Sequence, residues 1–230
     1  MAGRDTYYVV KRPPARPWRQ RLAAGLAAGA ALLTIGVAWG RPLASAPCGA
    51  VATDAAESDR HDRPLDSGLK VGEKVSTFYV RAVTGPLKNK SVCYVCRNGE
   101  RPVVMVFFRE ITPAVAQLLR EIDAVVDRNR ATGLRSFGVF LPREGPGPLA
   151  DVQTLAFNEQ IAMPLTISAG GDSPPGQKVH PRAAVTVVLY RELVVEAAFA
   201  CRSGELDAGR SSVILQAVRS LAGEDAPPNR

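Results

Sequence analysis

The sequence predicts an α/β domain in which helices cover both faces of a central sheet, behind an N-terminal transmembrane helix or signal segment. Apolar, β-branched runs alternate along the chain with segments whose apolar residues recur at helical spacing. Gly- and Pro-containing turns separate these segments from about residue 69 onward. Before that point the chain has one long uncharged stretch, followed by a polar stretch without apolar periodicity.

The N-terminal residues have the pattern of a membrane-directing segment. Leu22–Gly40 contains 19 residues without a charge, enough to cross a hydrocarbon core of about 30 Å as a helix. The leader 1–21 carries six basic residues against Asp5, which predicts a cytoplasmic N-terminus. These basic residues are Arg4, Lys11, Arg12, Arg16, Arg19 and Arg21.

The sequence leaves two interpretations of this segment open. The first, which we favour, is an uncleaved single-pass anchor. The second is a cleaved signal with Ala44-Ser45-Ala46 before the cut, although Pro47 makes that site a poor one. Both interpretations place the rest of the chain outside the cytoplasm. Residues 41–68 then form a flexible linker.

The charge distribution argues against nucleic-acid binding. The formal net charge is +7, but the leader 1–21 supplies most of it. No basic stripe interleaved with aromatic residues remains in the rest of the chain. The membrane, reached through the N-terminal helix, is therefore the one partner that the composition indicates.

The first half of the domain reads as strand, turn, strand and helix. Residues 75–83 have strand composition, and 84–86 and 97–100 are turns on either side of the short segment 92–96. Residues 102–108 form a continuous apolar run, as expected for a strand buried on both faces. Thr112 as N-cap and Pro113 at the first helical position open a helix that Gly133 ends.

The second half continues the alternation. We expect strands at 134–141 and 164–167, and a helix at 149–161 between them. A Gly- and Pro-rich loop covers 169–181, and a hairpin follows with strands 185–190 and 193–199 joined across Arg191–Glu192. A closing helix over 211–221 completes a domain of residues 69–222, and 223–230 forms a disordered tail.

Three stretches resemble the thioredoxin-like fold, in its redoxin and peroxiredoxin branch. VGEKVSTFYVRAVTGP is similar to the opening of that family, and SVCYVCRNGERPVVMVFF to its first central strand with the segment before it. AAVTVVLYRELVVEAAF is similar to the hairpin that carries the family's cis-proline. The resemblance implies a mixed central sheet flanked by helices.

The residues on which that family relies are missing here. Its chemistry lies where the first central strand meets its helix, where a helix N-terminus favours a thiolate. The matching residues run from Thr112 to Val115, and neither cysteine is present. Val115 stands at the nucleophile position, and Val185 at the cis-proline position before Thr186. The resemblance therefore implies no peroxidase activity by the family's route.

Cys93 and Cys96 are the candidate catalytic residues. They can bridge only if the backbone turns between them, because an extended strand separates residues i and i+3 by about 10 Å. The resemblance implies a short helical turn here, at the sheet end opposite the usual site. Lys88, Lys90 and Arg97 would favour thiolates. In a working pair, Cys93 would attack and Cys96 would resolve.

Three other readings of the pair stay open: a static disulfide, two buried inert thiols, and a metal site. Only Cys48, His61, His180 and Cys201 supplement the pair, and none lies in a ligand-like motif, so we predict no metal. Arg97 occupies the position where a haem-attachment motif has histidine, and we predict no cofactor. Cys201 should lie at the opposite end of the sheet, buried and unpaired; Cys48 lies in the linker and is free to link chains.

Two functions are consistent with this sequence. The first is a membrane-tethered, extracytoplasmic thiol–disulfide oxidoreductase acting on protein thiols through Cys93 and Cys96. The second is a catalytically inactive binding or scaffold domain of the cell envelope. Its partner would bind a cleft formed by Arg109, Thr112 and His180 at the usual redoxin site.

Overall fold

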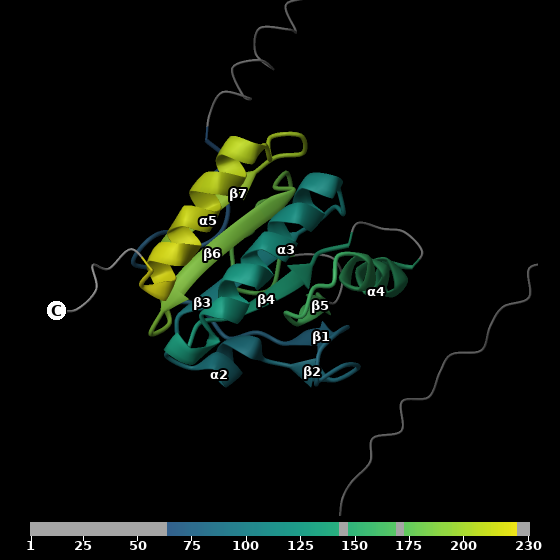
Figure 1. Cartoon of the computed structure of the whole chain (residues 1–230), viewed down its shortest axis with the longest axis horizontal. Coiled ribbons are helices and arrows are strands. Elements are labelled where there is room, and N and C mark those ends of the chain that lie inside the picture. The colour runs from purple at the N-terminus through teal and green to yellow at the C-terminus, as the bar shows by residue number, and fades with distance from the viewer. Residues whose placement is uncertain (1–63, 143–146, 169–172, 225–230) are drawn as a thin grey trace, which may run out of the picture. The chain divides into compact units, whose positions relative to one another are not determined.

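The computed structural model describes residues 64–142, 147–168 and 173–224 (Figure 1). The predicted leader 1–21, membrane segment 22–40, most of the linker and the tail after Glu224 lie outside these residues. In the described ranges, no helix combines the length and apolar character needed to cross a membrane. The elements are β1 (Val80–Ala82), β2 (Ser91–Val92), α2 (Tyr94–Asn98), β3 (Val103–Phe108), α3 (Pro113–Arg128), η1 (Arg130–Thr132), β4 (Arg135–Phe140), α4 (Pro148–Asn158), β5 (Leu165–Ile167), β6 (Val185–Arg191), β7 (Val194–Cys201) and α5 (Ala208–Ala222).

The strands form one mixed seven-stranded sheet in the order β2-β1-β5-β4-β3-β6-β7. Strand β3 pairs in parallel with β4 and antiparallel with β6, and β4 pairs in parallel with β5. All six residues of β3 are buried, because the strand has neighbours on both sides and packed layers on both faces. This confirms the buried strand predicted from the apolar run at 102–108.

The two faces of the sheet are covered differently. Helices α3, α4 and α5 pack on one face with the core cluster that includes Val106, Leu119 and Val187, and Figure 1 shows α3 and α5 lying across the strands. Because β3–α3–β4 and β4–α4–β5 step across the sheet in the same direction, right-handed crossovers place both helices on one face. The other face is covered by α2 and by residues 69–79, which precede β1.

Helix α3 begins as the sequence predicts and ends earlier. Thr112 is its N-cap, with Oγ1 accepting a hydrogen bond from the backbone N–H of Val115 at 3.3 Å. At the other end Nδ2 of Asn129 donates to the carbonyl of Val125 at 2.8 Å, which satisfies a helix-terminal acceptor. The helix therefore stops at Arg128, and η1 carries the chain to Gly133, whose φ is +92°.

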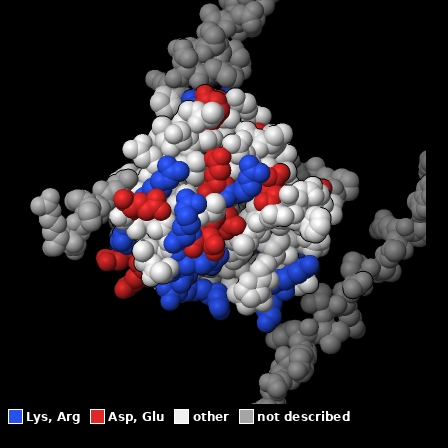
Figure 2. Space-filling model, viewed as in Figure 1, with Lys and Arg blue, Asp and Glu red and all other residues white. Residues whose placement is uncertain are grey.

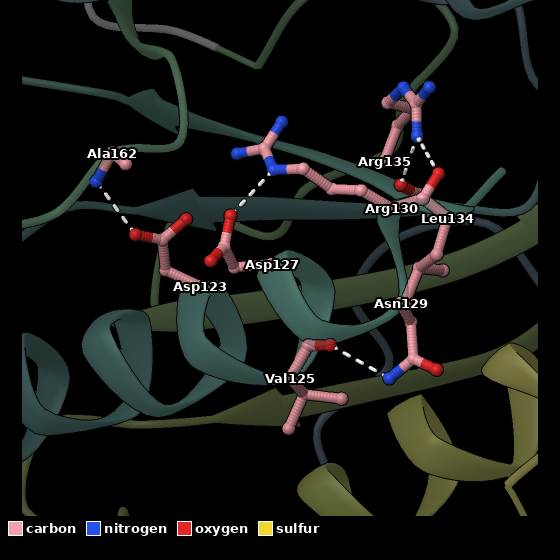
Figure 3. A network of polar contacts seen from close by, with 8 residues as sticks. All are labelled: Asp123, Val125, Asp127, Asn129, Arg130, Leu134, Arg135 and Ala162. Carbon is pink, nitrogen blue, oxygen red and sulfur yellow. Dashed lines mark hydrogen bonds and ion pairs between the residues drawn. The ribbon is translucent and has the colours of Figure 1, made fainter. Parts of the chain in front are cut away.

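Figure 3 shows the polar contacts that fix this end of α3. Asp123 is buried, and its Oδ2 accepts from the backbone N–H of Ala162, just before β5, at 2.6 Å. Arg135, at the start of β4, donates from Nη1 to the carbonyls of Arg130 and Leu134, at 3.0 and 2.8 Å respectively. These contacts join the C-terminal end of α3 to two neighbouring strands.

Two predicted boundaries need correction. The strand expected at 75–83 is regular only over Val80–Ala82, although Val75 and Phe78 are buried in extended chain. The hairpin turn lies at Glu192–Leu193 and not at Arg191–Glu192. Both turn residues have positive φ, +52° and +63°, as a two-residue turn that follows the twist of the strands requires.

The folded chain also begins before Leu69, the predicted start of the domain. Ser67 and Gly68 are buried. Oγ of Ser67 lies 2.7 Å from Oγ1 of Thr186, the second residue of β6, and the N–H of Gly68 donates to the carbonyl of Lys178 at 3.0 Å. This short segment therefore packs against the second half of the domain.

Candidate functional site: the Cys93–Cys96 disulfide

Cys93 and Cys96 form a disulfide at the start of α2, with their Cα atoms 5.3 Å apart. Cys93 is the N-cap of the helix, and its Sγ accepts a hydrogen bond from the backbone N–H of Cys96 at 3.1 Å. The backbone therefore makes the turn that the bridge requires. The sequence left four interpretations of the pair open. The bonded pair agrees with two of them, a static disulfide and a redox-active one.

The two sulfur-bearing residues differ in exposure. Cys93 is buried, with 5% of its surface exposed, whereas Cys96 and the following Arg97 are exposed. An attacking thiolate from solvent therefore meets Cys96 first. The sequence contains no signal for this difference, because a helix of five residues is too short to show a period.

The two residues between the cysteines attach the turn to the sheet. The ring of Tyr94 stacks on that of Phe137 in β4, with centroids 5.2 Å apart and planes at 19°. Val95 is fully buried in the same cluster. The redox candidate is thus a surface turn held from below by apolar contacts.

The disulfide lies at the end of the sheet opposite the usual redoxin site. Only residues 99–102 separate α2 from the first residue of β3, whereas Thr112 follows the last residue of β3 and caps α3 (Figure 1). A strand of six residues is roughly 20 Å long at about 3.3 Å per residue. The predicted displacement of the dithiol is confirmed.

A group of polar atoms is buried beneath the turn. Tyr94 Oη, Asn98 Nδ2 and Tyr190 Oη have no hydrogen-bond partner of suitable geometry within the described ranges. Burial raises the pKa of Tyr190 above its ordinary value, and the nearby amide of Asn98 opposes part of that rise. Burial also raises the pKa of Tyr94.

The raised pKa of Tyr190 makes stability depend on alkaline pH. Because the folded protein holds the phenol proton more tightly than the unfolded chain, the contribution is complete below the ordinary pKa of 10.0. It is lost as pH rises above that value, by up to about 1.4 kcal/mol per pH unit. We expect Tyr190→Phe to flatten this loss in denaturation midpoints measured from about pH 8 to pH 11. Parallel curves for the two proteins would contradict this prediction.

The usual redoxin site has neither a sulfur nucleophile nor the complete cleft predicted from the sequence. Arg109 and Thr112 line a cavity of about 670 Å³ together with residues of α4. His180 does not line it: its backbone N–H donates to Oγ of Ser67 at 2.9 Å, and its Nδ1 accepts from the N–H of Arg182 at 3.0 Å. The structure therefore brings together two of the three cleft residues, because the loop with His180 packs against the N-terminal segment. Val115 is buried.

Cys201 is a free, buried thiol, as predicted. Cys201 is the last residue of β7 and pairs with Val185 of β6, which in turn pairs with Phe108, the last residue of β3. Cys201 therefore lies at the same end of the sheet as Thr112. Burial raises the pKa of this thiol, and a hydrogen bond with Arg210 opposes that rise. Cys201 is therefore a poor nucleophile at neutral pH.

Comparisons with known proteins reveal a likeness of structure only. No family model matches the sequence, and no curated protein matches it. An uncharacterised conserved protein of Geobacillus kaustophilus is 11% identical, with a TM-score of 0.55 over 73% of this chain and 92% of that one. A candidate protein disulfide isomerase of Bacteroides thetaiotaomicron is 15% identical, with a TM-score of 0.51 over 69% and 95%.

A third similar structure is the yeast mitochondrial 1-Cys peroxiredoxin, 10% identical, with a TM-score of 0.51 over 70% of this chain and 83% of that chain. Identities this low carry no information about activity. The structural likeness, together with the mixed sheet, shows that the described residues have a thioredoxin-like fold.

Proposed function

We propose that this protein exchanges disulfides with protein thiols through Cys93 and Cys96, on the extracytoplasmic side of a membrane. One observation carries the proposal: an exposed Cys96 is bonded to a buried Cys93 whose sulfur receives a backbone N–H. A bridge with one exposed cysteine residue and one stabilised leaving group is suited to exchange.

The steps follow from this asymmetry. A substrate thiolate attacks Sγ of Cys96, the bond between Cys96 and Cys93 breaks, and Cys93 leaves as a thiolate. The N–H of Cys96, which already points at Sγ of Cys93, stabilises that charge. A second substrate thiolate then attacks the substrate's own sulfur and releases Cys96 as a thiolate. The substrate loses two electrons and the protein gains them; with a substrate disulfide the sequence runs in reverse.

The order of attack is therefore the opposite of the one predicted from the sequence. There Cys93 was the attacking thiol, because it starts the turn. Cys93 is buried and Cys96 is exposed, which supports Cys96 as the residue that forms the mixed disulfide. Cys93 then acts as the resolving thiol.

The location is part of the proposal. The uncharged segment 22–40 behind a basic leader supports a single-pass anchor with a cytoplasmic N-terminus. A bonded Cys93–Cys96 pair accords with the oxidising compartments in which disulfides persist. Protease added to spheroplasts, from which any outer envelope has been removed, should remove the domain and spare the leader; a domain protected until the inner membrane is lysed would place it in the cytoplasm.

The test is insulin reduction by the full-length protein with serine variants of each cysteine. We expect Cys96→Ser to reduce the rate to background. Cys93→Ser should also lose turnover but accumulate a mixed disulfide with substrate at Cys96, visible on a non-reducing gel. Cys201→Ala is the matched control, since its thiol is buried and lies at the other end of the sheet.

Two results would overturn this proposal in different ways. Trapping of substrate on Cys93 in Cys96→Ser would restore the order expected from the sequence. Wild-type rates in both serine variants would remove exchange altogether. The inactive binding domain would then take its place, and the cavity lined by Arg109 and Thr112 would be its candidate site.

A further inference from the structure

The net charge of the described residues is concentrated in the chain segment that contains the disulfide. Residues 64–142, 147–168 and 173–224 carry 18 Lys and Arg side chains and 14 Asp and Glu, an excess of four positive charges. Residues 81–101 alone carry five basic side chains and one acidic side chain, so they account for the entire excess of four positive charges. The five are Arg81, Lys88, Lys90, Arg97 and Arg101, and the one is Glu100.

These five cations also differ from many others in having no ion-pair partner. Several cations elsewhere have an ion-pair partner, for example Arg120 with Glu159 at 3.2 Å and Arg191 with Glu196 at 2.9 Å. No carboxylate in the described ranges lies within ion-pair distance of the five, and all five residues are exposed. Their charge is therefore available to a partner.

The five cations lie on consecutive parts of the chain: Arg81 in β1, Lys88 and Lys90 between β1 and the edge strand β2, Arg97 in α2, and Arg101 just before β3. Strand β2 is the edge strand, it pairs with β1 through Arg81 and Ser91, and α2 follows it directly. Figure 2 shows Lys and Arg side chains along the lower margin of the molecule, the side on which Figure 1 places β2 and α2. Arg97 is the residue next to the exposed Cys96.

We propose that the partner exchanging with Cys96 is a protein that presents an acidic segment, which docks on the surface formed by these five cations. This proposal depends on the exchange function above. Concentrated charge of one sign raises the association rate of an oppositely charged partner by about 10- to 1,000-fold at low salt. A nucleic acid offers the same negative charge but no thiol or disulfide, whereas exchange at the exposed residue Cys96 requires one.

The experiment uses the reduced full-length protein and three peptides that differ only in flanking residues. Each carries one cysteine as a mixed disulfide with thionitrobenzoate, flanked by Glu, Ser or Lys. The Cys96 thiolate attacks the peptide sulfur and releases the coloured thionitrobenzoate thiolate, which gives the rate. Dividing each rate by that for 2-mercaptoethanol removes differences in intrinsic reactivity.

We expect the Glu peptide to react about tenfold faster than the Lys peptide at low ionic strength. The ratio should approach one at about 0.5 M salt, where the screening length is only a few ångströms. Arg97→Glu combined with Arg101→Glu should invert the preference. Arg182→Glu, an exposed arginine in the loop before β6, is the matched control and should leave it unchanged.

A second readout separates docking from exchange. A labelled acidic peptide without cysteine should bind the wild-type protein in fluorescence anisotropy and should not bind the double variant. Exchange with equal rates for all three peptides, and no binding, would overturn the docking surface and leave the exchange function standing. Binding without exchange would overturn the exchange function and, with it, the identification of the docked protein as an exchange partner. Tighter binding of a single-stranded oligonucleotide than of the acidic peptide would overturn the assignment to a protein.

Discussion

Replacing Phe137 by alanine is expected to lower the free energy of unfolding by about 3–5 kcal/mol, the usual cost of removing a buried aromatic ring. Phe137 is fully buried in β4. The centroid of its ring lies 6.4 Å from that of Phe78 and 5.2 Å from that of Tyr94, on which it stacks. Tyr94 is the first residue of α2 and lies between the two cysteines. Because the cavity would open directly under the disulfide turn, we also expect the bridge to become easier to reduce.

Phe140→Ala is the matched control, because this residue lies in the same strand and its side chain faces the other core cluster. Phe140 packs on Phe108 with centroids 5.2 Å apart, on the side of α3. Urea denaturation should show a loss of similar size for both variants, about 3–5 kcal/mol. The equilibrium between the Cys93–Cys96 disulfide and glutathione should shift toward the reduced protein only in Phe137→Ala. Equal shifts in both variants would show that the turn senses global stability and not its own support.

The sequence predicted the sheet well where neighbouring residues decide the outcome. The apolar run of β3 can be recognised from its own residues, and Thr112 and Pro113 alone indicate where α3 begins. The displaced dithiol was also predictable, since the residues 93–96 precede the central strand whatever the sheet does around them. Cys201 followed from the same connectivity.

Features set by distant residues were not predictable. His180 leaves the cleft with Arg109 because its loop bonds to Ser67, which is 113 residues earlier in the chain. The exposure of Cys96 depends on Tyr94 and Val95 turning toward β4, which no local pattern indicates. Arg81 joins the cations of the segment that contains the disulfide only because β1 pairs with the edge strand β2 through Arg81 and Ser91.

Gly138 shows the same dependence on distant residues and has a second large expected effect. It is a buried residue of β4 facing α3. A Cβ built there would lie 2.7 Å from Cδ2 of Leu165 in β5 and 3.3 Å from Cε1 of Phe108 in β3. Gly138→Ala is therefore expected to destabilise the fold by about 1–3 kcal/mol through overpacking, although a strand alanine would ordinarily be favourable.

The clash with Leu165 can be isolated by shortening that side chain. Leu165→Val removes the Cδ atoms and should cost about 1 kcal/mol alone, because it leaves a small void. Combined with Gly138→Ala, it makes room for the new methyl group, so the double variant should be more stable than the sum of the two single changes predicts. We expect a coupling of about 1 kcal/mol or more from urea denaturation of all four proteins. Strict additivity would mean that Phe108, and not Leu165, sets the limit on the size of residue 138, because the ring of Phe108 is the next nearest group.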